Sequence, residues 1–311
     1  MTVSPAALLT PIPAAPTGIG PRIAPRIAPY LLVGPLTLLL FVFAILPCLL
    51  TLLLAFFDVD ILAGTIRFVG FENFARAAAR GEVLNSLRVT FTYILLTVPP
   101  SMILGLLIAL AINSLRRGRA FWQAVYFLPV AATLVAMSIV WRWMFVGRRG
   151  IVDQTLGQMT GLVDWLNSPV LSLPAVAIVG NWQQIGFVVV LYLAALAAVP
   201  SHQIDAARVD GASAWHRFWH VTWPAIGPTT VFVGIITSVN ALRVFDTVST
   251  MTGGGPSRSS QTLAHLMWER GIYFFDIGGG SVVTLVLLAL AIAATALQRI
   301  MTARLEKAGT R

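Results

Sequence analysis

Polar side chains interrupt two long apolar stretches of this sequence, and they are its first candidates for chemistry. Polar residues inside membrane-spanning segments are costly and are functional candidates by default. Amide groups match the hydroxyls of an uncharged polyol, and aromatic rings stack on the apolar faces of a sugar. We therefore expect these residues to line a solute path. They are Asn181, Trp182, Gln184, Asn240, Arg243 and Asp246, with Gln183 and Tyr192 in the same stretch as the first three.

The same residues also have a purely structural interpretation. Asn and Gln side chains commonly form hydrogen bonds between membrane helices. Arg243 and Asp246 are spaced i,i+3, which would allow them to pair with each other on a continuous helix. Sequence alone leaves both alternatives open.

Catalytic and metal-binding patterns are weak. His216 and His220 are spaced i,i+4, as zinc ligands on a helix can be, but no HExxH pattern is present and a third ligand would have to be the distant His202. We expect these histidines to lie on a helix surface at an interface. No Ser/His/Asp or Cys/His constellation stands out, so we predict no catalytic residues, no metal site and no independent enzyme activity.

The composition indicates an integral membrane protein. Hydrophobic residues make up 57% of the 311 residues and charged residues only 11%, against about 25% charged residues in soluble domains. The net charge of +9 comes from basic residues in short loops without interleaved aromatics, which argues against nucleic acid as a partner. Lys307 is the only lysine and Cys48 the only cysteine. The chain therefore lacks the P-loop lysine that nucleotide phosphates require, and any ATP and Mg²⁺ would be bound by another subunit.

Long apolar runs predict an all-α, polytopic bundle of six transmembrane helices in the lipid bilayer. The expected spans are 30–57, 88–113, 120–146, 173–199, 224–246 and 281–300. Residues 1–29 contain seven prolines and are predicted to form a flexible tail. Residues 30–303 would form the transmembrane domain, and 304–311 a C-terminal tail.

The distribution of arginine predicts the orientation. With the N-terminus inside, the inner segments hold eleven basic and three acidic residues, whereas the outer segments hold eight of each. The loop 114–119, with three arginines in six residues, is the strongest signal of the positive-inside kind. We expect both termini and the polar stretch 201–224 in the cytoplasm. The outer segments 58–87 and 147–172 should be ordered caps. For 247–280 we expect a turn, a short surface helix over 262–275 and a flexible glycine row, 278–280.

The stretch 201–224 predicts two short helices joined at a glycine. Asp210 and Gly211 have the composition of a turn, and Pro224 is suited to begin the next span. Trp215, Phe218 and Trp219 follow the turn at spacings that place them on one helical face. Such an aromatic face between two spans indicates a docking surface.

This stretch resembles the cytoplasmic EAA loop of bacterial ABC-importer permeases. The family pattern, Glu-Ala-Ala, three residues, Gly, nine residues, Ile-x-Leu-Pro, is matched in register, with Asp205 for Glu, Val221 for Ile and Trp223 for Leu. Four further segments resemble carbohydrate-type permeases of the maltose, lactose and glycerol-3-phosphate group. They are RFVGFENF (67–74), YFLP (126–129), NWQQIGF (181–187) and VFDTVSTMTGGGP (244–256). The resemblance covers about residues 30–300.

The resemblance implies a type I importer permease fold in the bacterial inner membrane. It implies a cytoplasmic ATPase dimer that binds ATP and Mg²⁺, a second permease subunit and a periplasmic or lipid-anchored solute-binding protein. The residues it assigns to ATPase coupling are Asp205, Ala206, Ala207, Arg208, Gly211, Trp215, Phe218 and Pro224. A sugar, a sugar alcohol and glycerol phosphate all remain open as the solute. There are two alternative functions. One is an ion-coupled secondary transporter that uses Asp246, and the other is a membrane scaffold that docks a cytoplasmic partner.

Overall fold

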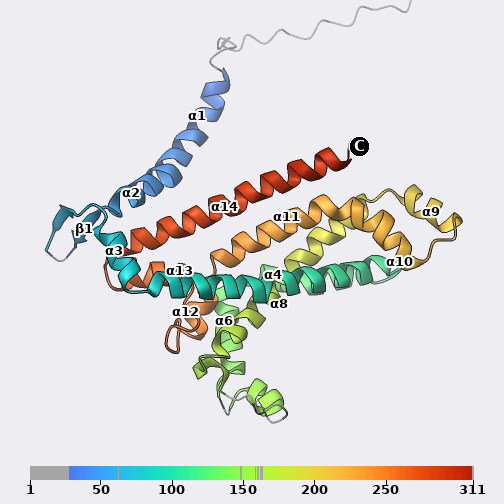
Figure 1. The fold of residues 1–311 in the computed structure, drawn as a ribbon. Helices are drawn as coiled ribbons and strands as arrows, with labels where there is room; N and C mark the ends of the chain where they lie inside the picture. Colours follow the sequence, from blue (N-terminus) through green and yellow to red (C-terminus); the bar gives the residue numbers. More distant parts are fainter. Residues whose placement is uncertain are drawn as a thin grey trace, which may run out of the picture. The chain divides into compact units, whose positions relative to one another are not determined.

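Apolar helices make up most of the computed structural model, which describes residues 28–61, 63–147, 149–157, 159, 161 and 164–309. The predicted flexible tail, apart from Ala28 and Pro29, and the last two residues of the predicted C-terminal tail lie outside the described residues. The chain divides into two units, Met1–Leu50 and Thr51–Arg311, and each is described by itself. The drawing in Figure 1 labels most of the helices named below and the first strand.

The first unit is a single apolar helical segment. It comprises α1 (Ala28–Leu40), a π-helical turn η1 (Phe41–Ile45) and the beginning of α2 (Leu46–Leu54). The π-helical turn lies just ahead of Pro47, whose ring would clash with a carbonyl of the preceding turn in a regular helix. From Val33 to Leu50 its large apolar side chains are exposed, as expected for a helix that faces lipid.

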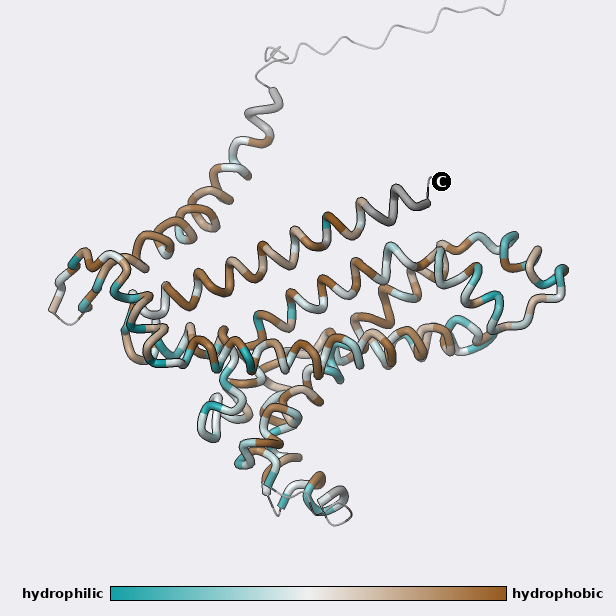
Figure 2. Tube along the Cα trace, in the orientation of Figure 1, coloured by the Kyte–Doolittle hydropathy of each residue, from teal (hydrophilic) through white to brown (hydrophobic). Residues whose placement is uncertain are grey.

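The second unit contains α4 (Glu82–Ser114), α8 (Ser172–Ala198), α11 (Trp223–Leu242) and α14 (Ile277–Gly309). In the described part of the chain, five helices, including the segment 33–54, are long and apolar enough to cross a membrane. In Figure 2, brown (hydrophobic) residues predominate in much of α4 and α11 and in the coloured part of α14. The predicted all-α bundle is therefore present, with the addition of one small hairpin described below.

The third predicted span, 120–146, is not one straight helix. It consists of α5 (Arg119–Ala131) and α6 (Leu134–Met144), which meet at an angle of 94°. Ala132 and Thr133 are extended at the break, with ψ of 142° and 127°. Pro129 already removes one hydrogen bond from the last turn of α5, and Thr133 is a preferred residue type at a helix N-cap. If the bent pair counts as one span, the residues that the structure describes contain six.

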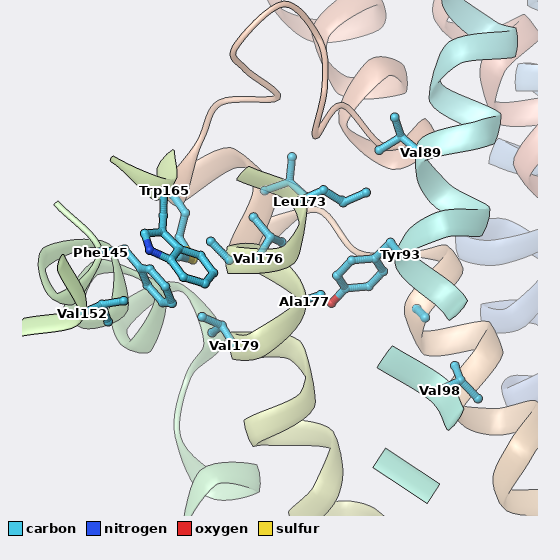
Figure 3. Close-up of a cluster of buried hydrophobic side chains, with 14 residues drawn as sticks. Val89, Tyr93, Val98, Phe145, Val152, Trp165, Leu173, Val176, Ala177 and Val179 are labelled. Atoms are coloured by element: carbon cyan, nitrogen blue, oxygen red, sulfur yellow. The ribbon is translucent and has the colours of Figure 1, made fainter. Parts of the chain in front are cut away.

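Helices α4 and α8 run in the same direction and form the centre of the second unit. Near their first turns, a buried cluster includes Val89 and Tyr93 of α4 and Val176 of α8, and in Figure 3 the Tyr93 ring points toward α8. Near their last turns, Ile112 and Leu196 share a second cluster. Consequently the loop 114–119 lies at the same end of this unit as the residues that follow α8.

Glycines allow these helices to approach closely. A Cβ at Gly180 would clash with the Tyr93 hydroxyl, and a Cβ at Gly186 would clash with the carbonyl oxygen of Tyr126 in α5. Small residues at such crossings are a common means of packing membrane helices, because van der Waals contact is their main attraction.

The segment between the first two spans is ordered, as predicted, and includes a β-hairpin that was not predicted. Strands β1 (Phe57–Asp60) and β2 (Thr65–Phe68) pair antiparallel, and α3 (Glu72–Ala79) follows. The buried Asn73 amide donates hydrogen bonds to the carbonyl oxygens of Ala55 (2.8 Å) and Phe57 (2.9 Å). These bonds hold α3 against the start of the hairpin.

Two expectations for 247–280 are wrong. The chain forms α12 (Asp246–Met251), a turn, α13 (Leu263–Trp268) and the π-helical turn η5 (Glu269–Tyr273). Helix α13 is buried along Leu263–Leu266 against α4 and α14, because its apolar side faces the bundle and not a bilayer surface. The glycine row 278–280 is helical and packed, since a Cβ at Gly280 would lie 2.7 Å from the Cα of Gly271.

Candidate functional site

Two breaks in the helical structure lie close to each other beside α8. One is the 94° bend between α5 and α6. The other separates α11 from α12, where Arg243 ends α11 and Phe245, with φ of −132° and ψ of −54°, precedes α12. Irregular backbone at membrane depth is tolerated where it is buried in protein or lines a cavity. The two breaks therefore mark the region where a polar site can form.

A cavity of about 390 Å³ lies between these breaks, within the size range of small-molecule sites. Val130 and Leu134 line it from the α5–α6 bend. The α8 side contributes Gln183, Gln184 and Phe187, and Tyr93 comes from α4. The residues around the α11–α12 break that line it include Asn240, Arg243, Phe245 and Asp246. The walls combine amides, one cation, one anion and aromatic rings.

Four residues of the predicted solute path line this cavity: Gln184, Asn240, Arg243 and Asp246. Gln184 also connects two helices, since its Nε2 donates to the carbonyl oxygen of Thr237 in α11 at 3.3 Å. Its amide plane is thus fixed beside the cavity.

Arg243 and Asp246 do not form the ion pair that their i,i+3 spacing allows, and neither takes part in any of the salt bridges of the described residues. The reason is the helix break. Spacing of i,i+3 brings side chains together only on one continuous helix, and α11 ends at Leu242. The span predicted for 224–246 is correspondingly shorter at this end. Both charged residues line the cavity without a salt bridge to any described residue.

Asn181 and Trp182 lie outside the lining of the cavity. The Asn181 Nδ2 donates to the carbonyl oxygens of Leu96 (2.8 Å) and Ala177 (2.9 Å), which is the interhelical role of the structural interpretation. Trp182 packs edge-on against Trp141 of α6 at 5.8 Å between ring centroids. Tyr192, mentioned with them, is buried in the cluster at the other end of α8.

Sequence reasoning missed Tyr93 and Phe187 as lining residues and did not include Gln183 in the predicted set. Phe187 lies four residues after Gln183, hence on the same face of α8, and this spacing was a usable signal. Tyr93 lies in another helix, α4, and no local pattern connects it with α8.

The predicted coupling stretch contains two helices joined at Gly211, α9 (Ser201–Val209) and α10 (Ala214–Arg217). Gly211 has φ of +76°. Its N–H donates to the Arg208 carbonyl oxygen (3.1 Å), and the Ala212 N–H donates to that of Ala207 (3.0 Å). This pair of bonds is a Schellman motif, which ends helices with glycine in the left-handed conformation. The Ser213 side chain then caps α10 by accepting from the His216 N–H at 3.2 Å.

Aromatic side chains form a continuous row after the turn, exposed at Trp215 and Trp219 and partly buried at Phe218. Trp215, Phe218, Trp219 and Trp223 are linked by ring contacts of 5.2–6.4 Å between centroids. Trp215 is 71% exposed, whereas Trp223 is partly buried against the cluster at the ends of α4 and α8. Trp223, which departs from the family pattern, therefore anchors the row to the bundle.

Pro224 does not begin a new helix. Helix continues from α10 through the π-helical turn η4 (Phe218–Thr222) into α11, so that 214–242 form one helical segment. In η4 the Trp223 N–H donates to the Phe218 carbonyl oxygen. The wider π-helical turn accommodates the proline ring that follows it. The aromatic row is consequently rigidly connected to the span that borders the cavity.

Charged and histidine residues of this stretch lie on its surface. Asp205 and Arg208, spaced i,i+3 on α9, form an ion pair at 3.1 Å with both side chains exposed. His216 and His220 stack at 3.9 Å between ring centroids. No cluster of three potential metal ligands occurs among the residues that the structure describes.

Comparisons with known proteins agree on one family. The family described as binding-protein-dependent transport system inner membrane component matches residues 74–307. The chain is 31% identical over 274 residues to the sn-glycerol-3-phosphate transport system permease protein UgpA of Agrobacterium fabrum, covering 88% of this chain and 94% of that protein. It is 30% identical over 269 residues to the trehalose/maltose transport system permease protein MalF of Thermococcus litoralis, covering 86% and 90%.

Two further similarities place the fold and broaden the range of relatives. The osmoprotective compounds uptake permease protein GgtC of a Synechocystis species is 31% identical over 266 residues, covering 83% of this chain and 92% of that protein. The crystal structure of a bacterial ABC transporter involved in the import of the acidic polysaccharide alginate contains a chain of the same fold. It superposes with a TM-score of 0.77 at 20% identity and covers 90% of this chain and 97% of that chain.

Proposed function

This chain belongs to the family of binding-protein-dependent transport system inner membrane components. It is thus a permease subunit of an ABC importer and not an enzyme, and we propose that its cavity passes a neutral polyol. A sugar or a glycoside of a small polyol fits the chemistry of the lining. Family membership also argues against the two alternatives raised from the sequence, an ion-coupled secondary transporter and a scaffold without transport activity.

The observation that carries this proposal is the mixed lining of the cavity. Gln183, Gln184 and Asn240 offer amide donors and acceptors beside the rings of Tyr93 and Phe187. Arg243 and Asp246 add a donor group and an acceptor group of opposite charge. A neutral polyol can accept from the first and donate to the second, so both charges are satisfied without a charged solute.

A phosphorylated polyol is the second candidate. The unpaired Arg243 favours it, because guanidinium groups bind phosphate in a bidentate geometry, and the UgpA relative is named for glycerol-3-phosphate. Asp246 in the same cavity argues against it, since a like charge near the phosphate is unfavourable. Other relatives are named for trehalose and maltose, and for osmoprotective compounds.

The test is uptake by the complete transporter in proteoliposomes, with ATP inside and solute-loaded binding protein outside. Gln183→Ala and Asn240→Ala should each reduce the uptake rate about tenfold, the effect of one or two lost hydrogen bonds, with unchanged ATPase activity in the absence of solute. Asn113→Ala, at the exposed end of α4, is the matched amide control. Uptake that is equal in all three variants would show that the cavity is not the solute path.

Arg243→Gln separates the two candidate solutes. For a neutral polyol the variant should retain uptake within roughly tenfold, because glutamine still donates a hydrogen bond. For a phosphorylated polyol the loss should reach about a hundredfold, because hydrogen bonds to a charged group contribute about 1.5–3 kcal/mol and glutamine carries no charge to meet the phosphate. The comparison is made with a neutral sugar and glycerol-3-phosphate as the two labelled solutes.

We propose that 201–224 couples this chain to a cytoplasmic ATPase dimer, which binds the ATP and Mg²⁺. Ala206, Ala207, Gly211, Trp215 and Phe218 would supply most of the contact. Exposed aromatic side chains on a short, capped helix are suited to be anchors in a partner's pocket. The continuous helix 214–242 would transmit movement of that contact to the cavity, beside Asn240.

We also propose that both termini and 201–224 face the cytoplasm, with a second permease subunit and an external binding protein completing the transporter. The loop 114–119 and α9 lie at one end of the second unit, whereas α14 begins at the other end beside α13. The three segments expected inside after the first span all carry arginine: 114–119, 201–224 and the end of α14. Their placement on one side of the membrane is what the positive-inside rule requires. Cysteine labelling from either side, at 116 and at 272, would test the orientation.

A further inference from the structure

An apolar groove between α5 and α8 is separate from the cavity. Its volume is about 540 Å³, and Arg119, Gln123, Phe127, Val190, Ala194 and Ala197 are among its lining residues. Phe127 and Val190 are exposed, and small alanine side chains form its floor on α8. It lies near the end of the second unit that carries the loop 114–119 and α9.

Polarity changes along the groove. Arg119 and Gln123 lie at the end nearest the loop, and Phe127 and Val190 lie further along. Arg119 and Phe127 are eight positions apart, which corresponds to about 12 Å along a helix. One leaflet has about 15 Å of hydrocarbon. The basic end of the groove can therefore lie at the depth of the lipid headgroups, while its apolar part is short enough to lie within one leaflet.

Positive charge is concentrated at the polar end. Arg116 and Arg117 precede Arg119 and are exposed. Within the described part of the chain, none of the three forms an ion pair. Asp205, an acidic residue at the same end, is already paired with Arg208. An anionic group at the mouth of the groove would meet uncompensated guanidinium groups.

We propose that this groove binds an anionic phospholipid, with the phosphate at Arg119 and an acyl chain along Phe127, Val190 and Ala194. Basic pockets between transmembrane helices are suited to anionic headgroups, and guanidinium groups bind phosphate oxygens in a bidentate geometry. A helix of another subunit could cover the apolar part of the groove, but it would leave Arg116, Arg117 and Arg119 without a negatively charged partner. The phospholipid satisfies both parts of the groove.

The experiment is native mass spectrometry of the delipidated full chain, titrated with phosphatidylglycerol and, separately, with phosphatidylcholine of the same acyl chains. We expect phosphatidylglycerol to bind at least fivefold more tightly. Arg119→Gln should weaken it about fivefold, the effect of one basic residue near a membrane surface, and leave phosphatidylcholine unchanged. Arg299→Gln, at an exposed position of α14, is the matched control and should change neither.

Two further variants address the apolar part. Ala194→Phe and Ala197→Phe fill the groove from α8 and should reduce binding of both lipids, with circular dichroism showing that the helical content is unchanged. Equal affinity for the two lipids in the unmodified chain would overturn the proposal, as would equal effects of Arg119→Gln and Arg299→Gln. A photoactivatable benzophenone at position 127 should give lipid adducts in membranes. Adducts with protein alone would show that another helix occupies the groove.

Discussion

The Asn181 side-chain amide donates a hydrogen bond of 2.8 Å to the carbonyl oxygen of Leu96, across the interface of α8 and α4. In an uninterrupted α-helix this oxygen would accept from the N–H of residue 100, but position 100 is a proline and has none. Membrane helices tolerate proline where a neighbouring helix satisfies the freed carbonyl group. Asn181 therefore compensates for Pro100, 81 residues earlier in the chain.

Asn181→Ala should destabilise the fold by about 1 kcal/mol, within the range measured for hydrogen bonds between membrane helices. In a Pro100→Ala chain the new N–H at position 100 can donate to the Leu96 oxygen. Asn181→Ala should therefore lower the free energy of unfolding much less in that chain than in the unmodified one. Unfolding in detergent of the unmodified chain, the two single variants and the double variant gives the coupling energy between positions 100 and 181. Additive effects would contradict this role, and loss of uptake at unchanged stability would restore Asn181 to the solute path.

Gly211→Val should abolish transport while the chain remains in the membrane. A residue with a Cβ at φ of +76° costs roughly 1–2 kcal/mol, and a β-branched residue costs more, so the Schellman turn between α9 and α10 would open and the aromatic row would move. Gly227→Val is the matched control, since Gly227 has ordinary helical φ and a Cβ there meets nothing within 4 Å. Solute uptake equal in both variants would exclude a coupling role for the turn.

Features with a local physical cause were predictable from the sequence. The apolar runs gave the approximate spans, because length and hydropathy alone decide whether a segment crosses a membrane. The Gly211 turn and the aromatic face after it follow from glycine's access to positive φ and from helical spacing. The carbohydrate-permease resemblance agrees with the family shown by the comparisons.

The remaining features depend on contacts between distant residues. Asn181 and Gln184 were equivalent in the sequence, yet one serves a carbonyl of α4 and the other borders the cavity. The break at Ala132 lies in an apolar run without glycine, and only Pro129 hinted at it. An Arg243–Asp246 pair was one of two open alternatives, and it relied on helical spacing across a position where the helix ends. Burial of Leu263 was missed because an amphipathic pattern is the same at a bilayer surface and inside a bundle.

Gly186→Ala should destabilise the crossing of α5 and α8. A Cβ at this position would clash with the Tyr126 carbonyl oxygen, and backbone cannot move aside as a flexible side chain can. Overpacking of this kind costs typically 1–3 kcal/mol. Thermal unfolding of the purified chain measures it, with Gly227→Ala as the control that should leave the midpoint unchanged. A stability equal to that of the unmodified chain would show that the two helices separate easily.

The stability of the chain should depend on pH through His265, which lies in α13 between two spans. His265 is 3% exposed beside the rings of Phe245 and Trp268. Burial lowers the pKa of this histidine below its ordinary value of 6.5, and the nearby Glu269 opposes the shift only in part. Near pH 6 the unfolded chain therefore binds a proton that the folded chain does not, so the free energy of unfolding decreases as pH falls below about 6.5.

Unfolding in detergent at pH 7.5 and pH 5.5 measures this effect. His265 can contribute a slope of at most about 1.4 kcal/mol per pH unit, and His265→Gln should remove that contribution while keeping a polar side chain of similar size. His202→Gln, at an exposed position of α9, is the matched control and should retain the full pH dependence, because it leaves His265 and its buried surroundings unchanged. Carboxylates that titrate in this range affect all three chains alike, so the difference between the two variants isolates His265. Identical pH dependence of the unmodified chain and His265→Gln would show that the folded chain accepts the proton at this position without cost.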